Sequence, residues 1–381
     1  MNIAVIGAGN RARKYLSCLP GGVFVRYVVE PDRLRLQQTA NRFNIHEEGC
    51  FTDSGAFFRE AHDIDSVIIA APDRLHVPLS LKAVKKGWHV LLEKPAALSA
   101  EEYGLLETAA EKAGVQVGVC LEMRFHPYFR RIKELVDGGA VGKVLDIEHT
   151  EHIGPDRMAH TFVRGLWSRK ADAGPIFLSK CCHDADFLLW LTGGSVVSVK
   201  GSGRLEKFVP RANKLLRCLG CPDLACPYSA VRLYKERREW TDGFDIPEGS
   251  TFDAVIDAEL AAGRYGRCVY HCDNDVFDSQ DVTAHLSNGV TLDIHLEGTS
   301  MEEGRETLIH GTSGTLVARG GRIILPDGTS ENYADVLAQP LHGGADRALV
   351  HAFFSSIADG RPFRASLSSA LEGHRLCYLA G

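Results

Sequence analysis

An apolar run near the first residue leads directly into a glycine-rich turn, and this junction constrains the fold more than any other part of the chain. The turn reads Gly7-Ala8-Gly9-Asn10-Arg11-Ala12, a G-x-G-x-x-A pattern. In such a turn the first glycine permits the tight bend, the second lets the backbone approach a pyrophosphate, and the alanine allows the next helix to pack closely. Free N–H groups at the amino end of that helix attract an anion. The sequence therefore predicts a dinucleotide-binding βαβ unit, with all of these residues except Ala8 at the cofactor.

The end of the next expected strand, Val23–Val29, indicates which dinucleotide is bound. Glu30 follows this strand at the distance expected for the acid that accepts hydrogen bonds from the adenosine ribose, and its charge would repel a 2′-phosphate. The nearby Arg33 would instead pair with such a phosphate. The sequence favours NAD over NADP, with Glu30 and Arg33 as further cofactor-binding candidates.

The first third of the chain alternates apolar strands with amphipathic helices. Further strands are expected over Ser66–Ala70, His89–Leu92 and Gln116–Val119, with helices between them. Such alternation is typical of right-handed βαβ units. It predicts a doubly wound parallel sheet, a Rossmann domain, over residues 1–123.

The pattern changes after this point. A basic amphipathic helix over Pro127–Asp137 is followed by longer segments, such as Thr291–Leu296, in which polar and apolar residues alternate. Alternation of this kind is typical of a sheet with one buried face, and Asn288-Gly289 is a strong hairpin signal. We expect a second domain over residues 124–381, with an irregular excursion at about residues 205–251.

Composition and charge exclude several classes of partner. The formal net charge of -6 argues against nucleic acid and against an anionic membrane surface. There is no apolar run of membrane-span length, and Met1-Asn2 enters the first strand without the regions of a signal peptide. A cytoplasmic location is therefore expected, where most of the eleven cysteines would be reduced.

The expected strand His89–Leu92 ends in Glu93-Lys94-Pro95. In a parallel α/β sheet, ligands bind beyond the carboxyl ends of the strands. Glu93 and Lys94 are therefore candidates for contact with the cofactor, and Lys94 can also reach a substrate. The alternative is an ordinary turn with a solvated Glu-Lys pair.

A neighbouring strand ends in Ala71-Pro72 and is followed by His76. This loop is expected to lie under the far half of the cofactor, which adds Ala71, Pro72 and His76 to the cofactor-binding candidates. A helix-capping or surface role is the alternative for His76.

Together these features resemble the Gfo/Idh/MocA family, named after glucose–fructose oxidoreductase and inositol dehydrogenase. The matching sequences are the glycine-rich turn, Ala71-Pro72-x-x-x-His76, Glu93-Lys94-Pro95 and a later Lys180-x-x-His183-Asp184-x-Asp186. The resemblance covers nearly the whole chain. It implies a Rossmann domain followed by an α/β domain whose large, mostly antiparallel open sheet often mediates homo-oligomers, as a dimer or tetramer. It also implies bound NAD(P) and redox chemistry at a secondary hydroxyl of a sugar, polyol or similar molecule.

The resemblance assigns chemical roles to two residues. In this family the lysine of the Glu-Lys-Pro motif lies near the reacting hydroxyl, which carries over to Lys94, and the histidine acts as acid and base, which carries over to His183. An aspartate usually precedes the histidine by four residues and orients it, but Ser179 stands there in this chain. Either another group, such as Asp184 or Asp186, takes the orienting role, or the histidine is tuned differently.

These roles satisfy the needs of hydride transfer. The carbinol carbon must be held against the nicotinamide while the hydroxyl proton leaves. A histidine titrates near neutrality and suits proton removal, whereas a lysine stabilises a developing alkoxide and has its pKa lowered by burial. We expect His183 to be the general base and Lys94 the electrostatic stabiliser and proton relay. A core histidine in an apolar helix is the alternative for His183.

Three further residues are candidates for substrate contact. Arg164 and Trp167 lie shortly before the histidine motif, and Lys180 lies within it. The two cations would suit an anionic group on the substrate, such as a carboxylate, sulfonate or phosphate. Solvated surface charges are the alternative.

A cysteine cluster lies in the irregular excursion. Cys218, Cys221 and Cys226 form a C-x2-C-x4-C pattern, and a C-x2-C knuckle with glycine inside is a common zinc-ligand arrangement. Cys272, or else Cys268, would complete a closed, structural zinc site. Free thiols or a reversible disulfide are the alternative.

The leading hypothesis is an NAD-dependent oxidoreductase that transfers a hydride between nicotinamide and a secondary hydroxyl of a sugar, sugar acid or cyclitol derivative. The resemblance also admits an NAD-dependent glycoside hydrolase, which oxidises its substrate transiently, breaks the glycosidic bond by elimination and recycles the bound cofactor. A non-catalytic NAD sensor is disfavoured, because Lys94 and His183 are both present.

Overall fold

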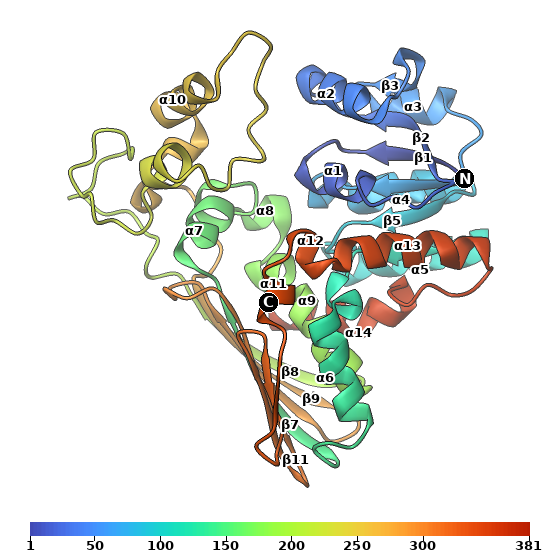
Figure 1. Cartoon of the computed structure of the whole chain (residues 1–381), viewed down its shortest axis with the longest axis vertical. Coiled ribbons are helices and arrows are strands. Elements are labelled where there is room, and N and C mark those ends of the chain that lie inside the picture. Colours follow the sequence, from blue (N-terminus) through green and yellow to red (C-terminus); the bar gives the residue numbers. More distant parts are fainter.

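The computed structural model describes residues 1–381 and contains two sheets, each with its own hydrophobic core (Figure 1). The first sheet has six parallel strands in the order β3-β2-β1-β4-β5-β6. Its strands are β1 (Asn2–Ile6), β2 (Phe24–Val29), β3 (Cys50–Phe51), β4 (Ser66–Ile69), β5 (His89–Leu92) and β6 (Val117–Val119). The helices and 3-10 turns between them are α1 (Asn10–Leu16), α2 (Arg33–Phe43), η1 (Glu47–Gly49), α3 (Ser54–Glu60), η2 (Asp73–Leu75), α4 (His76–Lys85) and α5 (Ala100–Ala113).

The apolar strands of this sheet are buried on both faces, as expected of a parallel sheet covered by helices. Val67, Ile68 and Ile69 in β4 are completely shielded from solvent. The strand order reverses between β1 and β4, which brings the carboxyl ends of β1, β4 and β5 to one edge. The expected Rossmann sheet is confirmed, and its ligand-binding edge carries the turns that follow these three strands.

The second sheet has eight strands in the order β14-β13-β12-β11-β7-β10-β9-β8. All neighbours are antiparallel except β7 and β10, so the mostly antiparallel sheet is confirmed. Asn288-Gly289 turns the chain between β9 and β10, with Gly289 at a φ of +85°. The strands are β7 (Val144–His152), β8 (Val196–Arg204), β9 (Ser279–Leu286), β10 (Thr291–Glu297), β11 (Gly304–Gly311), β12 (Gly314–Arg319), β13 (Arg322–Ile324) and β14 (Ser330–Asn332).

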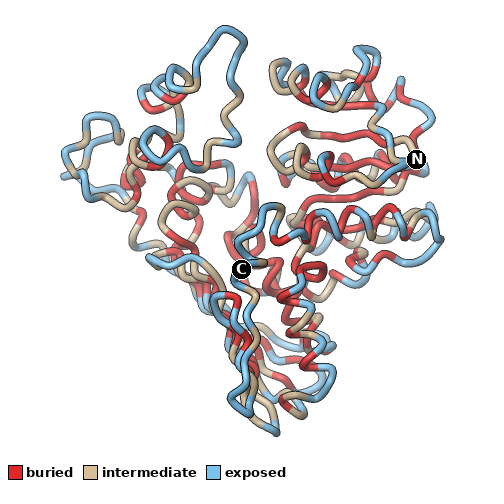
Figure 2. Tube along the Cα trace, in the orientation of Figure 1, coloured by how far each residue is buried: buried red, intermediate tan, exposed pale blue.

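Helices connect the two sheets and cover part of the second one. α9 lies at the centre and contacts α6, α14, β7 and β10. Figure 2 shows buried chain concentrated where these helices meet the sheets. None of the helices is both long and apolar enough to cross a membrane. These elements are η3 (Glu122–Phe125), α6 (Pro127–Asp137), α7 (Pro155–Arg157), η4 (Met158–Arg164), α8 (Lys170–Ala173), α9 (Ile176–Thr192), α11 (Ala334–Leu337), α12 (Pro340–Gly343), α13 (Ala345–Ala358) and α14 (Leu367–Ala380).

The C-terminal helices contribute to both cores. Leu349 and Phe353 of α13 pack into the core of the first sheet, whereas Leu376 of α14 packs into that of the second. The division of the chain at residue 123 remains a prediction, but the structure places part of the segment after residue 344 with the Rossmann core.

The irregular excursion has a small core of its own. Tyr234, Ile256 and Leu260 are fully or almost fully buried in it, apart from the two main cores. Its helices and turns are η5 (Val231–Glu236), α10 (Phe252–Ala262) and η6 (Arg264–Gly266). The excursion therefore extends beyond residue 251 and includes α10, whereas Val269 and Tyr270 of the following turn η7 (Val269–His271) belong to the core of the second sheet.

Candidate active site

The glycine-rich turn has the shape that a dinucleotide requires. Gly7 has a φ of +87°, and a Cβ there would lie 2.5 Å from the carbonyl oxygen of Ala70, so no other residue fits. A Cβ at Gly9 would meet no atom within 4 Å, which leaves room beside the backbone for a pyrophosphate. Ala12 is fully buried against the sheet, and no side chain caps the amino end of α1 at Asn10. The residues present therefore fit a bound dinucleotide.

Glu30 is buried at the carboxyl end of β2. Its Oε2 accepts a hydrogen bond from the backbone N–H of Ala8 at 2.8 Å, which ties it to the glycine-rich turn. Arg33 is exposed at the start of α2, whereas Arg35 Nη1 lies 3.7 Å from Glu30 Oε1. The arginine beside the expected ribose site is thus Arg35, which the sequence analysis did not single out.

Arg11 and Glu93 are held by each other rather than turned toward a cofactor. Arg11 Nε lies 2.9 Å from Glu93 Oε1, and Arg11 Nη2 lies 2.8 Å from Asp346 Oδ1 of α13. The hydroxyl of Tyr15 donates to Glu93 Oε1 at 2.6 Å. Burial alone would raise the pKa of Glu93, but Arg11 and Lys94 bring it below the ordinary value. In this structure both side chains therefore anchor the strand end, and their expected contact with the cofactor stays a prediction.

The loop after β4 is tied to the loop after β5. One ring nitrogen of the buried His76 lies 2.7 Å from the carbonyl oxygen of Pro95, and the other lies 2.9 Å from that of Ala71. Pro72 is exposed beside them. Because both ring nitrogens contact backbone, His76 holds the two loops together, and its expected contact with the cofactor stays a prediction.

Lys94 reaches across to the second domain. Its Nζ donates to the carbonyl oxygen of Ser179 in α9 at 2.6 Å. Burial alone would lower the pKa of Lys94, but Cys182, Glu93 and Asp73 raise it above the ordinary value. Burial thus acts in the expected direction, but the net shift of the pKa is upward. Lys94 stays protonated, which suits an electrostatic stabiliser better than a proton relay.

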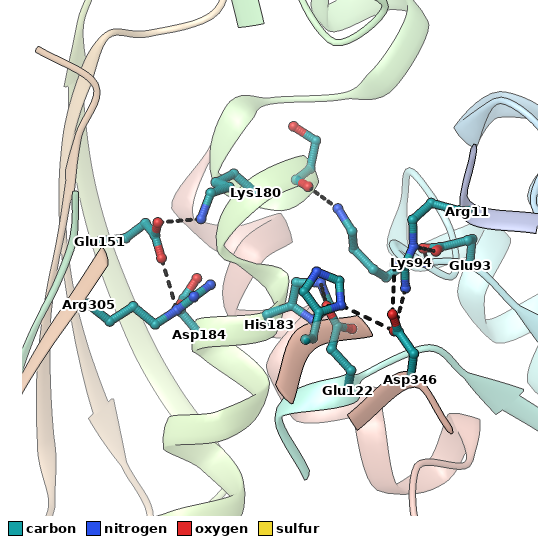
Figure 3. Close-up of polar contacts among 12 residues, drawn as sticks. Arg11, Glu93, Lys94, Glu122, Glu151, Lys180, His183, Asp184, Arg305 and Asp346 are labelled. Carbon is teal, nitrogen blue, oxygen red and sulfur yellow. Dashed lines mark hydrogen bonds and ion pairs between the residues drawn. The ribbon is translucent and has the colours of Figure 1, made fainter. Parts of the chain in front are cut away.

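His183 belongs to α9, and its ring lies near the side chain of Lys94 (Figure 3). Its Nε2 is 3.4 Å from Glu122 Oε1, and its Nδ1 is buried without a hydrogen-bond partner. Burial, followed by the positive charges of Lys94 and Arg305, holds the pKa of His183 well below its ordinary value. The ring is therefore neutral near pH 7, the state in which a histidine can accept a proton.

The carboxylate that faces His183 comes from η3, not from the helix of the histidine. Ser179 Oγ donates to the carbonyl oxygen of Ile176 at 3.4 Å. Asp184 pairs with Arg305 and with His149, whose Nε2 is 3.1 Å from Asp184 Oδ1. The ring of His183 contacts neither of them, and the carboxylate beside it is that of Glu122.

Asp186 has a different partner. It forms a two-pronged ion pair with Arg124, at 2.7 Å from Nε and 2.6 Å from Nη2. The sequence analysis missed Glu122, although a signal was available. Like Glu93, it is an acid shortly after an apolar strand of the parallel sheet.

Two of the three expected substrate contacts are engaged elsewhere. Arg164 is fully buried and donates at 2.6 Å to the carbonyl oxygens of Arg267 and Tyr228, so it supports the excursion. Lys180 forms an ion pair with Glu151, which also pairs with Arg305 (Figure 3). Both cations thus already have protein partners in this structure, and their expected anion-binding role stays an untested prediction.

Trp167 lies at the boundary between the domains. Its indole N–H donates to Asp73 Oδ2, in the loop after β4, at 2.9 Å. Burial raises the pKa of Asp73 above its ordinary value. This contact ties the second domain to the carboxyl edge of the Rossmann sheet, and Trp167 remains a candidate for substrate contact.

The structure does not gather the four cysteines proposed for zinc. The one group of three or more potential metal-ligand side chains with ligand atoms within 4.8 Å of one another is Asp146, Glu148 and His310. Cys218 Sγ lies 3.4 Å from Arg164 Nη2, and Cys272 Sγ lies 3.3 Å from the carbonyl oxygen of Cys268. All cysteines are free thiols. The zinc site over Cys218, Cys221, Cys226 and Cys272 therefore has no support in this structure.

A six-stranded Rossmann sheet whose carboxyl edge is met by a second α/β domain is the architecture of a two-domain, NAD-dependent oxidoreductase. Two family models match the chain: the oxidoreductase family with an NAD-binding Rossmann fold at residues 1–121, and the GFO/IDH/MocA C-terminal domain at residues 129–317. The chain belongs to the Gfo/Idh/MocA family.

Individual relatives are distant. The scyllo-inositol 2-dehydrogenase (NAD(+)) of Bacillus subtilis is 28% identical over 210 residues, which cover 53% of this chain and 57% of the relative. The chain thus spans little more than half the length of this curated relative.

Solved structures agree over the whole fold. An oxidoreductase from Agrobacterium radiobacter, in complex with NAD+, L-tartaric acid and magnesium, superposes with a TM-score of 0.73 at 17% identity, covering 100% of this chain and 96% of that one. Scyllo-inositol dehydrogenase from Lactobacillus casei, with bound NAD(H) and scyllo-inositol, gives 0.68 at 19% identity, covering 100% and 95%. At these identities the likeness shows the fold alone.

Proposed function

We propose that this NAD-dependent oxidoreductase transfers a hydride between nicotinamide and a secondary hydroxyl of a cyclitol or sugar derivative. The observation that carries the proposal is the pairing of a neutral His183 with a protonated Lys94 beyond the carboxyl end of β5. A general base and a fixed cation at this edge are what oxidation of a hydroxyl requires.

Each residue has a distinct part in the reaction. Bound NAD would supply the hydride acceptor. His183 takes the hydroxyl proton, because its ring is neutral and one ring nitrogen has no protein partner. Lys94, held by the carbonyl oxygen of Ser179, places its ammonium group where negative charge develops on the substrate oxygen. Glu122 steadies the ring and stabilises the imidazolium that forms.

The charges around the site favour a neutral polyhydroxy substrate over a sugar acid. Lys180 and Arg305 pair with Glu151, and Arg305 also pairs with Asp184. Arg164 is buried against backbone carbonyls. A substrate carboxylate would have to displace one of these buried partners, which costs more than contact with a free cation. The inositol dehydrogenases among the relatives are consistent with a cyclitol.

A substrate panel tests the proposal. Purified protein would be mixed with NAD and inositols, neutral sugars, sugar acids including tartrate, or glycosides, and NADH formation followed by absorbance. We expect activity with a neutral cyclitol or sugar. His183→Asn and Lys94→Ala should each lower kcat/KM by about 10²–10⁴-fold. His295→Asn and Lys143→Ala, at partly exposed or exposed positions away from the site, are the matched controls.

Three outcomes would contradict the proposal. Activity confined to sugar acids would overturn the preference for a neutral substrate. Full activity of Lys94→Ala would overturn the assigned chemistry. Turnover of a glycoside without net NADH accumulation would instead identify a redox-neutral glycoside hydrolase.

A further inference from the structure

The excursion from the second domain reaches back to the Rossmann domain. Its loop over residues 238–250, between η5 and α10, extends toward α1 and α2 (Figure 1). The reaction proposed above makes no use of this loop. Its contacts lie on the adenosine side of the dinucleotide site, remote from Lys94 and His183.

The carboxylate of Asp245 joins the loop to the Rossmann domain through two ion pairs. Asp245 Oδ1 lies 3.0 Å from Arg13 Nη1 of α1, and Asp245 Oδ2 lies 2.9 Å from Arg35 Nε of α2. Only 9% of the Asp245 side chain is exposed, although it belongs to a loop. Two backbone contacts flank it: Arg13 donates to the carbonyl oxygen of Asp242 at 3.2 Å, and Gln38 donates to that of Ile246 at 3.0 Å.

Arg35, one of the two arginines that contact Asp245, also lies next to the acid expected to bind the ribose. Arg35 Nη1 lies 3.7 Å from Glu30 Oε1, and Glu30 ends β2 at the place where this fold binds the adenosine ribose. An arginine next to that acid is the group that accommodates a 2′-phosphate in NADP-binding relatives of the fold. A pocket of about 490 Å³ lies between the loop and helices α1 and α2, lined by Asn10, Arg13, Gln38 and Asp245 among others but not by Arg35 or Glu30.

We propose that Asp245 makes the chain selective for NAD, by holding the two arginines that would otherwise bind the 2′-phosphate of NADP. With Asp245 in place, Arg35 and Arg13 already have a carboxylate partner, and a phosphate would meet the charges of both Asp245 and Glu30. The loop also covers the adenosine end of the site. The inference rests on dinucleotide binding by the Rossmann domain and not on the substrate proposed above.

Binding measurements on the full chain test the role of Asp245. Dissociation constants for NADH and NADPH would be measured by fluorescence titration of the unmodified protein, Asp245→Asn and Asp242→Asn. Asp242→Asn is the matched control, because it makes the same change in the same loop at a side chain that is 72% exposed and 4.0 Å from its nearest cation. We expect Asp245→Asn to shift the NADPH/NADH affinity ratio toward NADPH by about tenfold. The control should shift it by less than about twofold.

A second variant keeps the proposal testable if Asp245→Asn does not fold. In the otherwise unmodified chain, Arg35→Gln should leave weak NADPH binding unchanged, because Arg35 is not available to a phosphate. Combined with Asp245→Asn, it should remove the gained affinity. The proposal is overturned if Asp245→Asn behaves like Asp242→Asn, or if Arg35→Gln alone weakens NADPH binding. A chain that binds neither dinucleotide would contradict this inference together with the cofactor assignment.

Discussion

At the scale of single residues, the site couples a neutral base to a permanent cation. Lys94 is one of the charges that keep His183 unprotonated, and Glu93 and Asp73 are among the groups that keep Lys94 protonated. The two pKa values are thus displaced away from neutrality in opposite directions. This separation supports the proposed base and electrostatic stabiliser, because each group would be in its working state over a wide range of pH.

The pH dependence of activity follows from this arrangement. A histidine with the ordinary pKa of 6.5 would be half protonated at that pH, but His183 remains neutral there. We expect kcat/KM for hydroxyl oxidation to stay level as the pH falls from about 7 through 6.5, and to decline only in more acid solution.

Lys94→Gln removes a positive neighbour, which raises the pKa of His183 and moves the acid limb of the residual activity to higher pH.

The pH–rate profile of the unmodified protein and of Lys94→Gln is the measurement, with Lys143→Gln as a control. An acid limb with its midpoint at or above pH 6.5 in the unmodified protein would contradict the lowered pKa of His183.

Glu122 is expected to act through His183. Glu122→Gln keeps the shape of the side chain but removes its charge, so kcat should fall while KM changes little. The loss should be smaller than the factor of about 10²–10⁴ contributed by the base itself. Adding Ser179→Asp places a carboxylate at the position usual for the family and should restore part of kcat. Glu111→Gln, at an exposed position of α5, is the control. An unchanged kcat in Glu122→Gln would show that the ring is oriented by other contacts.

At the scale of elements, α9 is held in register by a buried ion pair. Arg124 of η3 contacts Asp186 of α9 through two nitrogens, and both side chains are at most 5% exposed. The same guanidinium donates to the carbonyl oxygens of Arg364 and Ser369, at the start of α14. These contacts connect the segment that carries Glu122 to the helix that carries His183, so they also set the geometry of the site.

Breaking this pair should destabilise the chain strongly. Asp186→Asn leaves a buried guanidinium without its counter-charge, and we expect the free energy of unfolding to fall by about 3–5 kcal/mol. Glu134→Gln, which breaks the exposed pairs of Glu134 with Arg130 at 3.7 Å and with Arg131 at 3.6 Å, should cost no more than about 1 kcal/mol. The two variants are compared by urea unfolding, in which the loss of structure is monitored by circular dichroism. Equal losses in the two variants would refute the structural role of the buried pair.

Some of the strands and helices could be predicted from the sequence, and others could not. Five strands of the first sheet, all except the two-residue β3, and the β9–β10 hairpin follow from apolar periodicity and from Asn288-Gly289, which are local signals. β12, β13 and β14 were not predicted, because short strands at a sheet edge carry little periodicity and depend on their neighbours. α10 was also missed, because its buried face packs only against the small core of the excursion.

At the scale of the whole molecule, several connections besides the Lys94–Ser179 contact join the two domains around the site. The C-terminal helices pack on both cores, Trp167 bonds to Asp73 across the boundary, and Asp245 reaches the adenosine side of the cofactor site. The site is therefore enclosed by segments far apart in the chain. Whether copies of the chain associate through the second sheet remains a prediction of the family resemblance.

The sequence by itself determined the Rossmann fold and the glycine-rich turn, and it singled out Lys94 and His183 as the catalytic candidates. These features are local: a turn that only glycine can make, strands that repeat, and short motifs that follow strand ends. The tertiary structure decided which charges are free to act. Arg164, Lys180 and Arg11 are cations of the same kind as Lys94 in the sequence, but each is committed to partners from distant segments. Likewise, the carboxylate facing His183 is Glu122, because through-space contact and not spacing along the chain sets the partner of a buried histidine.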